Sequence, residues 1–128
     1  MDREKILIYS DKKEQQKKPE QFQGMGQVRE PGCGDELSMY ISTRREIITE
    51  CSFTITDTAC PPLKACAALA AELALGKPVM EAYLISAGEL AAFFGGLPKE
   101  SMHCAQMAEL ALKQTLKDYA VKRMEGLA

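Results

Sequence analysis

The 128-residue sequence lacks a long apolar run, an excess of basic charge and any strong compositional bias. No apolar stretch approaches the roughly 20 residues that span a bilayer, and Ile6-Leu7-Ile8-Tyr9 is too short for the core of a signal peptide. A formal charge of −2 gives no net basic face for nucleic acid or an anionic membrane. We therefore expect a cytoplasmic protein whose main partner is neither nucleic acid nor a membrane.

Five cysteines and a single histidine stand out in an otherwise ordinary composition, with 46% hydrophobic and 27% charged residues. A chain of this length forms one globular domain that buries a core without disulfides. Because the cysteine number is odd and no secretion signal is expected, the thiols indicate metal or redox chemistry more readily than a disulfide framework.

The segment Pro31-Gly32-Cys33-Gly34-Asp35 places a thiol and a carboxylate two residues apart between glycines. In an extended backbone this spacing puts Cys33 and Asp35 on one face. The glycines allow positive φ angles and leave space beside the sulfur for a metal or a small cluster. The alternative is a glycine-rich turn with a buried cysteine, and the segment alone does not decide between the two.

The first half of the chain predicts a polar arm followed by a small antiparallel sheet. Residues 1–10 contain an apolar patch that fits a short helix or a strand, and residues 11–23 read as a solvated arm or linker. The ordered domain is expected over residues 24–126. Its strands are predicted at 24–28 as a short edge strand, at 37–42 by alternation of apolar and polar residues, and at 47–56 as the partner in a hairpin.

The second half predicts helices separated by glycine and proline. A helix is expected from Leu63 to Leu75, after Cys60-Pro61-Pro62 and before Gly76. Shorter helices follow at 78–85 and 87–94, then a loop at 97–101. A long last helix carries an apolar stripe, formed by Ala105, Ala108, Leu112, Leu116 and Tyr119.

The cysteines fall into two groups in this plan. Cys60 lies at a helix N-cap and Cys104 in the first turn of the last helix, beside His103, where the helix dipole favours a thiolate. Cys51 is in step with the core face of its strand and is interpreted as a small buried hydrophobe. Cys66 is expected to pack among alanines, with a reserve thiol near the site as the alternative.

Three cysteines at backbone transitions, Cys33, Cys60 and Cys104, together with Asp35 and His103, fit a tetrahedral metal site with one spare ligand. The separations are 27 residues from Cys33 to Cys60 and 44 from Cys60 to Cys104, which match no local zinc-finger spacing. The fold would have to assemble such a site.

These residues resemble those of the iron–sulfur cluster assembly scaffolds of the IscU type and the N-terminal domain of NifU. The resemblance extends from about Gly24 to Arg123. It is carried by Gly32-Cys33-Gly34-Asp35-Glu36, Cys60 before a helix, Gly76-Lys77, Glu81-Ala82, Leu97-Pro98, His103-Cys104, Ala108-Glu109 and Lys117-Asp118-Tyr119. It implies an α+β fold, in which a hairpin and a short edge strand form an antiparallel sheet, with several helices packed on one side and a long C-terminal helix.

The resemblance also implies a function. The protein would be a carrier rather than an enzyme, accepting sulfur from a cysteine desulfurase and iron from a donor, with a ferredoxin-type reductant. It would hold a transient [2Fe–2S] cluster and pass it to apo iron–sulfur proteins. Cys33, Cys60 and Cys104 would supply thiolates and Asp35 or His103 the fourth ligand. We further expect Cys104 to be the persulfide acceptor, since its helix position and the neighbouring His103 favour an exposed, reactive thiolate.

Two departures from the family pattern qualify the expectation. Pro61 follows Cys60 where the family commonly has glycine, so this loop should be stiffer. Leu97-Pro98-Lys99-Glu100-Ser101 replaces the Leu-Pro-Pro-Val-Lys segment that a dedicated Hsp70-type chaperone reads in many members, so weak chaperone binding is expected.

Two other functions remain open. One is a zinc-dependent sulfur acceptor of the same fold, in effect a sulfurtransferase, in a branch that has an insertion and lacks the histidine. The other is a structural zinc module that only binds partners. Because this chain has His103 and no insertion, the cluster scaffold is favoured.

Overall fold

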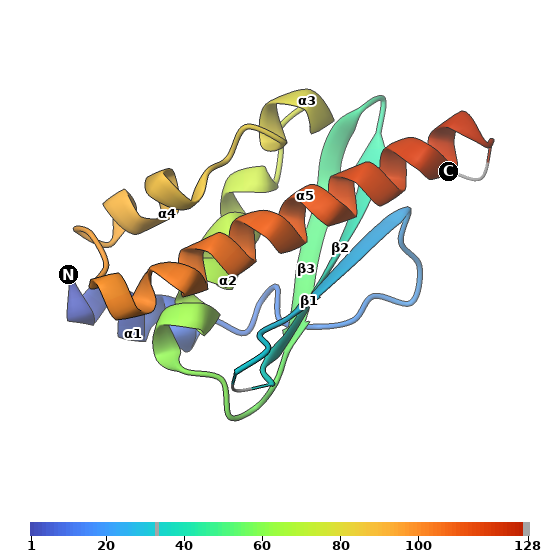
Figure 1. The fold of residues 1–128 in the computed structure, drawn as a ribbon. Coiled ribbons are helices and arrows are strands. Elements are labelled where there is room, and N and C mark those ends of the chain that lie inside the picture. The colour runs from blue at the N-terminus through green and yellow to red at the C-terminus, as the bar shows by residue number, and fades with distance from the viewer. Residues whose placement is uncertain (33, 127–128) are drawn as a thin grey trace.

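Three antiparallel strands form a single sheet in the spatial order β1-β2-β3 (Figure 1). They are β1 (Gly24–Arg29), β2 (Glu36–Arg44) and β3 (Ile47–Ile55), in a computed structural model that describes residues 1–32 and 34–126. The expected hairpin and edge strand are therefore confirmed, with β1 beside β2 at one edge.

The β2–β3 hairpin turns through Arg45 and Glu46, whose φ angles are both positive, 54° and 66°. Two positive φ angles are typical of the tight turn whose twist matches that of paired strands. Leu37, Met39 and Ile41 belong to the core and are at most 1% exposed. The alternation in the sequence thus identified the core-facing side of β2, although Ser38 and Tyr40 on its other side are also buried.

Two helices cover that face of the sheet, α2 (Pro61–Ala74) against β3 and α5 (Met102–Met124) against β1 and β2. Figure 1 shows α5 running diagonally across the sheet, with its N-terminal part extending beyond the strands. The two helices also contact each other, and alanines of α2 fill much of the core between them. The α+β fold with helices on one side is confirmed.

The contact between α5 and β1 is close because two glycines of the strand face the helix. A Cβ added at Gly24 would lie 2.7 Å from the Thr115 carbonyl oxygen and 2.8 Å from the Tyr119 Cβ. One added at Gly26 would lie 2.5 Å from the Thr115 nitrogen and 2.8 Å from the Ala111 oxygen. The helix backbone therefore rests directly on the strand backbone. This contact fixes where the first turn of α5 lies relative to the loop after β1.

Shorter helical segments complete the described chain: α1 (Arg3–Ser10), α3 (Val79–Ala82), α4 (Ala87–Phe93) and a 3₁₀ turn (Lys99–Ser101). The apolar patch near the N-terminus is thus a helix, which packs against α2, while α4 packs against α5. The helix predicted over 78–85 is shorter than expected, because its chain turns before Ser86, whose side chain caps α4. No helix in the described part of the chain is long and apolar enough to cross a membrane.

Residues 11–23 are mostly exposed or half-buried, as expected of a polar segment, but they are not a free linker. The Phe53 N–H donates a hydrogen bond to the Gln15 carbonyl over 2.8 Å, and Gln16 forms a parallel bridge with Phe53. The Phe22 and Tyr40 rings pack with centroids 5.0 Å apart. The segment covers the outer edge of β3, whose open backbone would otherwise be a template for another chain.

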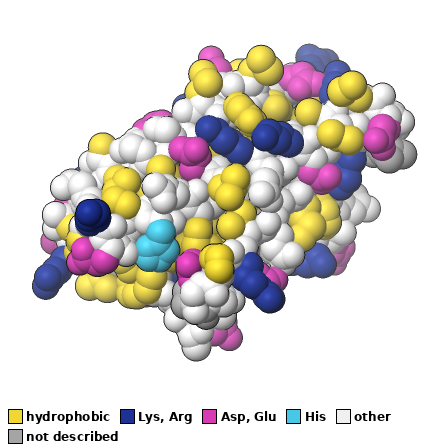
Figure 2. Space-filling model, viewed as in Figure 1, with side chains coloured by type: hydrophobic (Ala, Val, Ile, Leu, Met, Phe, Trp, Pro, Cys, Tyr) yellow, Lys and Arg dark blue, Asp and Glu magenta, His cyan; other side chains and the backbone are white. Residues whose placement is uncertain are grey.

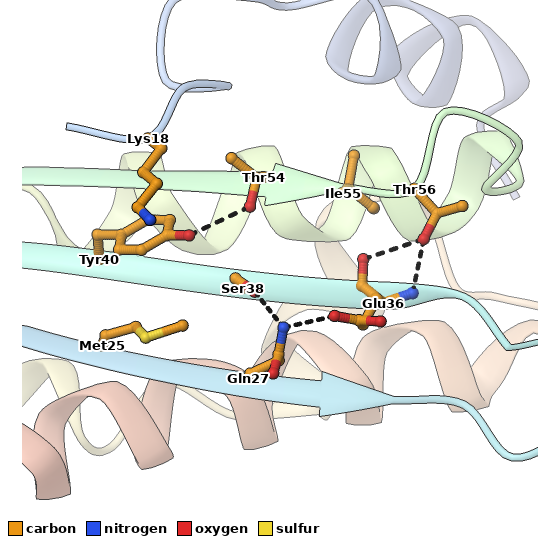
Figure 3. A pocket seen from close by; sticks show the side chains of 9 residues that line it. All are labelled: Lys18, Met25, Gln27, Glu36, Ser38, Tyr40, Thr54, Ile55 and Thr56. Atoms are coloured by element: carbon orange, nitrogen blue, oxygen red, sulfur yellow. Dashed lines mark hydrogen bonds between the residues drawn. The ribbon is translucent and has the colours of Figure 1, made fainter.

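The outer face of the sheet is polar and shallowly hollowed (Figure 3). The hollow encloses about 420 Å³ and is lined by Lys18, Met25, Gln27, Glu36, Ser38, Tyr40, Thr54, Ile55 and Thr56. The Gln27 amide donates to Glu36 and Ser38, and the Glu36 N–H donates to the Thr56 hydroxyl. Because no cysteine or histidine lines it, this hollow does not contain the predicted metal chemistry.

Candidate functional site

The candidate site lies where three connecting segments meet at one end of the sheet. Segment 30–35 joins β1 to β2, segment 56–60 joins β3 to α2, and segment 101–104 opens α5. A groove of about 270 Å³ is lined by Glu30 and Pro31 from the first segment and by His103 from the third. A contact between cysteine sulfurs joins the second segment to the third.

Cys60 and Cys104 bring their sulfur atoms within 3.7 Å of each other. Two thiolates bound to one tetrahedral metal ion at ~2.3 Å lie about 3.8 Å apart, whereas a disulfide bond is only about 2 Å long. Neither cysteine forms a disulfide with another described residue. Their spacing is therefore that of two ligands sharing a metal, although 44 residues separate them in the sequence.

His103 lies at the edge of this sulfur pair. Its Nε2 is 3.7 Å from the Cys104 Sγ, and its side chain is exposed. A nitrogen and a sulfur bound to the same tetrahedral metal lie about 3.6 Å apart, from bond lengths near 2.0–2.1 Å and 2.3 Å. The distance from His103 to Cys104 is therefore the one that two ligands of a shared metal would have.

Both sulfurs lie at the positive ends of helices. Cys60 is the N-cap of α2, with an extended backbone (φ −67°, ψ 153°) and two prolines in the first turn. Cys104 is the third residue of α5. The partial positive charge of a helix N-terminus favours a nearby anion, so both sulfurs lie at positions that suit a negatively charged metal ligand.

The loop before α2 is held in place by more than its prolines. The Lys64 ammonium donates to the Asp57 carbonyl over 2.9 Å, and the Ala59 N–H donates to the Thr56 carbonyl over 2.9 Å. These contacts, with Pro61, agree with the stiff loop expected from the sequence. Nothing in the sequence indicated that Lys64, on α2, would hydrogen-bond the loop that precedes this helix.

The two sulfur-bearing residues differ in exposure. Cys60 is exposed, while Cys104 is only 1% exposed. The sequence argument that an exposed Cys104 collects sulfur is therefore wrong about its exposure in this structure. The sequence did contain a signal for the burial of Cys104, since Cys104, Ala108 and Ala111 follow the i, i+4, i+7 spacing of one buried helix face.

The loop between β1 and β2 is a tight turn that carries Asp35. The Gly34 N–H donates to the Glu30 carbonyl, and the Glu30 N–H donates to the Asp35 carbonyl, both over 2.8 Å. Gly34 has a φ of 77°, which explains the need for glycine. Asp35 is half-buried. Cys33 lies outside the described residues, so its role as a ligand stays a prediction.

Cys51 and Cys66 lie inside elements and are buried, at 2% and 0% exposure. Burial raises the pKa of the Cys51 thiol to about 12. Burial, and to a lesser extent the charge of Cys60, raises the pKa of the Cys66 thiol to about 12 as well. Both stay protonated near neutral pH, and a protonated thiol is a poor metal ligand.

The fold thus brings Cys60, Cys104 and His103 together and places the loop of Asp35 beside them. Within residues 1–32 and 34–126, no three His, Cys, Asp or Glu side chains are arranged as a ready metal-binding group. The sulfur pair is the nucleus of the candidate site, and the first loop adjoins it.

Comparison with known proteins gives a consistent family. Residues 2–126 match the family model described as the NifU-like N-terminal domain. The chain is 36% identical over 102 residues to proteins of Archaeoglobus fulgidus named iron–sulfur cluster assembly scaffold protein IscU 1 and IscU 2. That alignment covers 80% of this chain and 65% of each relative, so the chain spans just under two thirds of their length. Identity to the IscU scaffold of Rickettsia prowazekii is 36% over 101 residues, 78% of this chain and 75% of the relative.

Solved structures share the fold of this chain. One is described as an iron–sulfur cluster assembly scaffold for the SUF system of Fervidobacterium islandicum, with a TM-score of 0.71 and 20% identity, covering 88% of this chain and 94% of that one. Another is the N-terminal part of a NifU-like protein of Brucella abortus, with a TM-score of 0.56 and 17% identity, covering 96% and 82%. At these identities the likeness establishes the fold alone.

Proposed function

The chain belongs to the family of NifU-like N-terminal domains, and from this premise we propose that it is a scaffold for iron–sulfur cluster assembly. It accepts sulfur from a cysteine desulfurase and iron from a donor, holds a transient [2Fe–2S] cluster, and passes the cluster to apo-proteins. A ferredoxin-type reductant supplies the electrons that convert persulfide sulfur to sulfide. In this role the protein is a cytoplasmic carrier rather than an enzyme.

The observation that carries the proposal is the sulfur pair at two helix N-termini, 3.7 Å apart. In the proposed site Cys33, Cys60 and Cys104 supply thiolates, and Asp35 or His103 supplies the fourth ligand. A hard oxygen or a nitrogen in place of a fourth thiolate leaves one exchangeable position. A cluster held this way can be released to an acceptor, as a carrier requires.

Anaerobic reconstitution with iron and sulfide tests the proposal directly. We expect iron and sulfide to bind in equal amounts and the absorption bands of a [2Fe–2S] cluster to appear. Transfer to an apo-ferredoxin should then remove those bands from the scaffold. A protein that binds no iron under these conditions, or that never releases its cluster, would not be a scaffold.

Asp35 and His103 are the two candidates for the fourth ligand, and substitution of each should affect cluster release differently. A carboxylate among soft thiolates is a labile ligand, so Asp35→Ala should slow transfer of the cluster to an acceptor. His103→Ala should leave the transfer rate closer to that of the wild type if Asp35 is the fourth ligand. Unchanged or faster transfer in Asp35→Ala would assign Asp35 to the turn alone.

Cys104 is the proposed persulfide acceptor. Its thiolate attacks the outer sulfur of the desulfurase persulfide, the donor's S–S bond breaks, and the donor thiolate leaves, so no net oxidation occurs. Since Cys104 is 1% exposed, the first turn of α5 must open, and Gly95 and Gly96 precede it with positive φ angles of 75° and 91°.

Mass spectrometry of peptides, after incubation with a desulfurase and cysteine without iron, locates the added sulfur atom. We expect it on the peptide of Cys104, and still there in the Cys60→Ala variant. Sulfur found mainly on Cys60, the exposed thiol, would overturn this order of events.

Zinc is the alternative metal, because the spacing of Cys60 and Cys104 would suit it equally well. A zinc-dependent sulfur acceptor would retain zinc and still carry a persulfide, whereas a structural zinc module would retain zinc and resist thiol reagents. Metal analysis of the purified protein, followed by a thiol-reactivity assay, separates both from the cluster scaffold.

Weak binding to an Hsp70-type chaperone remains part of the proposal. Lys99 and Glu100 form the 3₁₀ turn that leads into α5, in place of the family's Pro-Val pair. A peptide spanning Leu97 to Met102 should therefore bind the specialised chaperone poorly in a fluorescence titration, and tight binding would show that the change is tolerated.

A further inference from the structure

An apolar patch lies where α3 packs beside the C-terminal half of α5, away from the candidate site. Met80 is 82% exposed and Leu84 75%. Figure 2 shows hydrophobic side chains gathered over α3, with Lys or Arg side chains beside them. Leu116, on the floor of the patch, is 12 residues after Cys104 on the same helix, or about 18 Å along its axis.

A small pocket opens within this patch. It encloses about 120 Å³ and is lined by Val79, Met80, Tyr83, Leu116, Lys117 and Ala120. A cavity of roughly 150 Å³ holds a benzene-sized group, so this one accommodates a single apolar side chain of about the size of methionine. A single exposed leucine needs no explanation, but adjacent exposed side chains around such a pocket are typical of an interaction site.

The charges at the rim indicate what covers the patch. Lys113 is already engaged, with an ion pair to Glu109 at 3.2 Å and its ammonium over the Tyr83 ring. Lys117 and Glu81 are exposed, and neither forms an ion pair with another described residue. Among the described residues, an unpaired cation, Lys117, therefore lines the pocket from α5, and an unpaired anion, Glu81, follows Met80 on α3.

This arrangement is complementary to itself, and we propose that a second copy of this chain covers the patch. Around a twofold axis, Met80 of each copy enters the other's pocket, and Glu81 of each copy meets Lys117 of the other. The same surface then serves both copies, as the isologous interface of a symmetric dimer requires. Because α3 and the facing part of α5 offer a small area, the dimer is weak and depends on protein concentration.

Sedimentation velocity on the metal-free, reduced protein tests the dimer without involving the cluster or any disulfide. We expect the mass to rise from 14.1 kDa towards twice that value as concentration increases. Met80→Glu would bury a carboxylate in the pocket and should weaken association at least about tenfold. The matched control is Met124→Glu, which changes a methionine that is 89% exposed at the end of α5 and should leave association unchanged.

A charge-reversal cycle makes the test specific to the proposed contact. Glu81→Lys and Lys117→Glu should each weaken the dimer, and the double variant should restore it, because the pair then forms with its signs exchanged. Thermal unfolding of each variant checks that it remains folded. A protein that stays monomeric at all concentrations, association that Met80→Glu does not weaken, or a double variant without recovery would each overturn the proposal. None of these outcomes affects cluster binding, which is measured separately.

Discussion

The cysteines within elements and those at the starts of helices have the same side chain but different chemistry. Cys51, inside β3, and Cys66, in the second turn of α2, are buried with pKa values raised to about 12. Cys60 and Cys104 lie in the cap and first turn of helices, with their sulfurs 3.7 Å apart. Position relative to a helix end is therefore the basis on which we propose Cys60 and Cys104, and not Cys51 and Cys66, as ligands. Element interiors exclude the charged form, and helix N-termini favour it.

Alanine substitution should separate the two groups completely. After anaerobic reconstitution, Cys60→Ala and Cys104→Ala should retain almost no iron, and we expect Cys33→Ala to behave in the same way. Cys51→Ala and Cys66→Ala should keep the wild-type iron content and lose about 1 kcal/mol of unfolding free energy, because each leaves a small cavity. Iron loss in Cys66→Ala, with Cys60→Ala unaffected, would reverse the assignment.

Cys60 and Cys104 differ in exposure, and the rates at which they react with a thiol reagent in the metal-free protein measure that difference. Cys60 is exposed and should react at once, whereas Cys104 must wait for local opening of α5 and should react on the order of 100-fold more slowly. In denaturant the two rates should converge. Equal rates in the folded protein would mean that the start of α5 is already open.

Most of the fold could be predicted because its signals are local. Alternation in β2, the two prolines that begin α2 and the glycines after α2 and α4 each fix a boundary within a residue or two of that expected. The segment 11–23 was less predictable. Its polar side chains gave no sign that Gln15 and Gln16 pair through the backbone with β3, since backbone pairing needs no particular side chain.

The candidate site was predictable in composition but not in accessibility. Residue types and helix-start positions pointed to Cys60, Cys104 and His103, which the fold brings together. Gly24 and Gly26 set how closely α5 lies on β1, and we expect the burial of Cys104 at the start of the same helix to depend on that distance. Their role is visible only when the strand and the helix are seen together.

Gly26→Ala tests whether that close contact positions the site. The new Cβ would lie 2.5 Å from the Thr115 nitrogen, which is backbone and cannot move alone. We expect a loss of about 1–3 kcal/mol in urea unfolding, typical of overpacking, together with faster labelling of Cys104. Gly88→Ala is the matched control, because its nearest neighbour would be the Ser86 hydroxyl at 3.8 Å. A neutral Gly26→Ala would show that α5 can shift without cost.

The buried thiols should also make stability depend on pH. Burial raises the pKa of Cys51 from 9.0 to about 12 in the folded protein, so the unfolded chain loses this proton at lower pH than the folded one. The resulting stabilisation is fully present below pH 9 and is lost as pH rises from about 9 towards 12. One such thiol contributes at most about 1.4 kcal/mol per pH unit.

Urea unfolding at pH 7.5, 9 and 10.5 should therefore show a shallower alkaline decline in Cys51→Ala than in the wild type. The difference between the two proteins should be constant below pH 9, which separates lost packing from lost titration. Parallel curves across the whole range would mean that the Cys51 thiol ionises as readily in the folded protein as in the unfolded one.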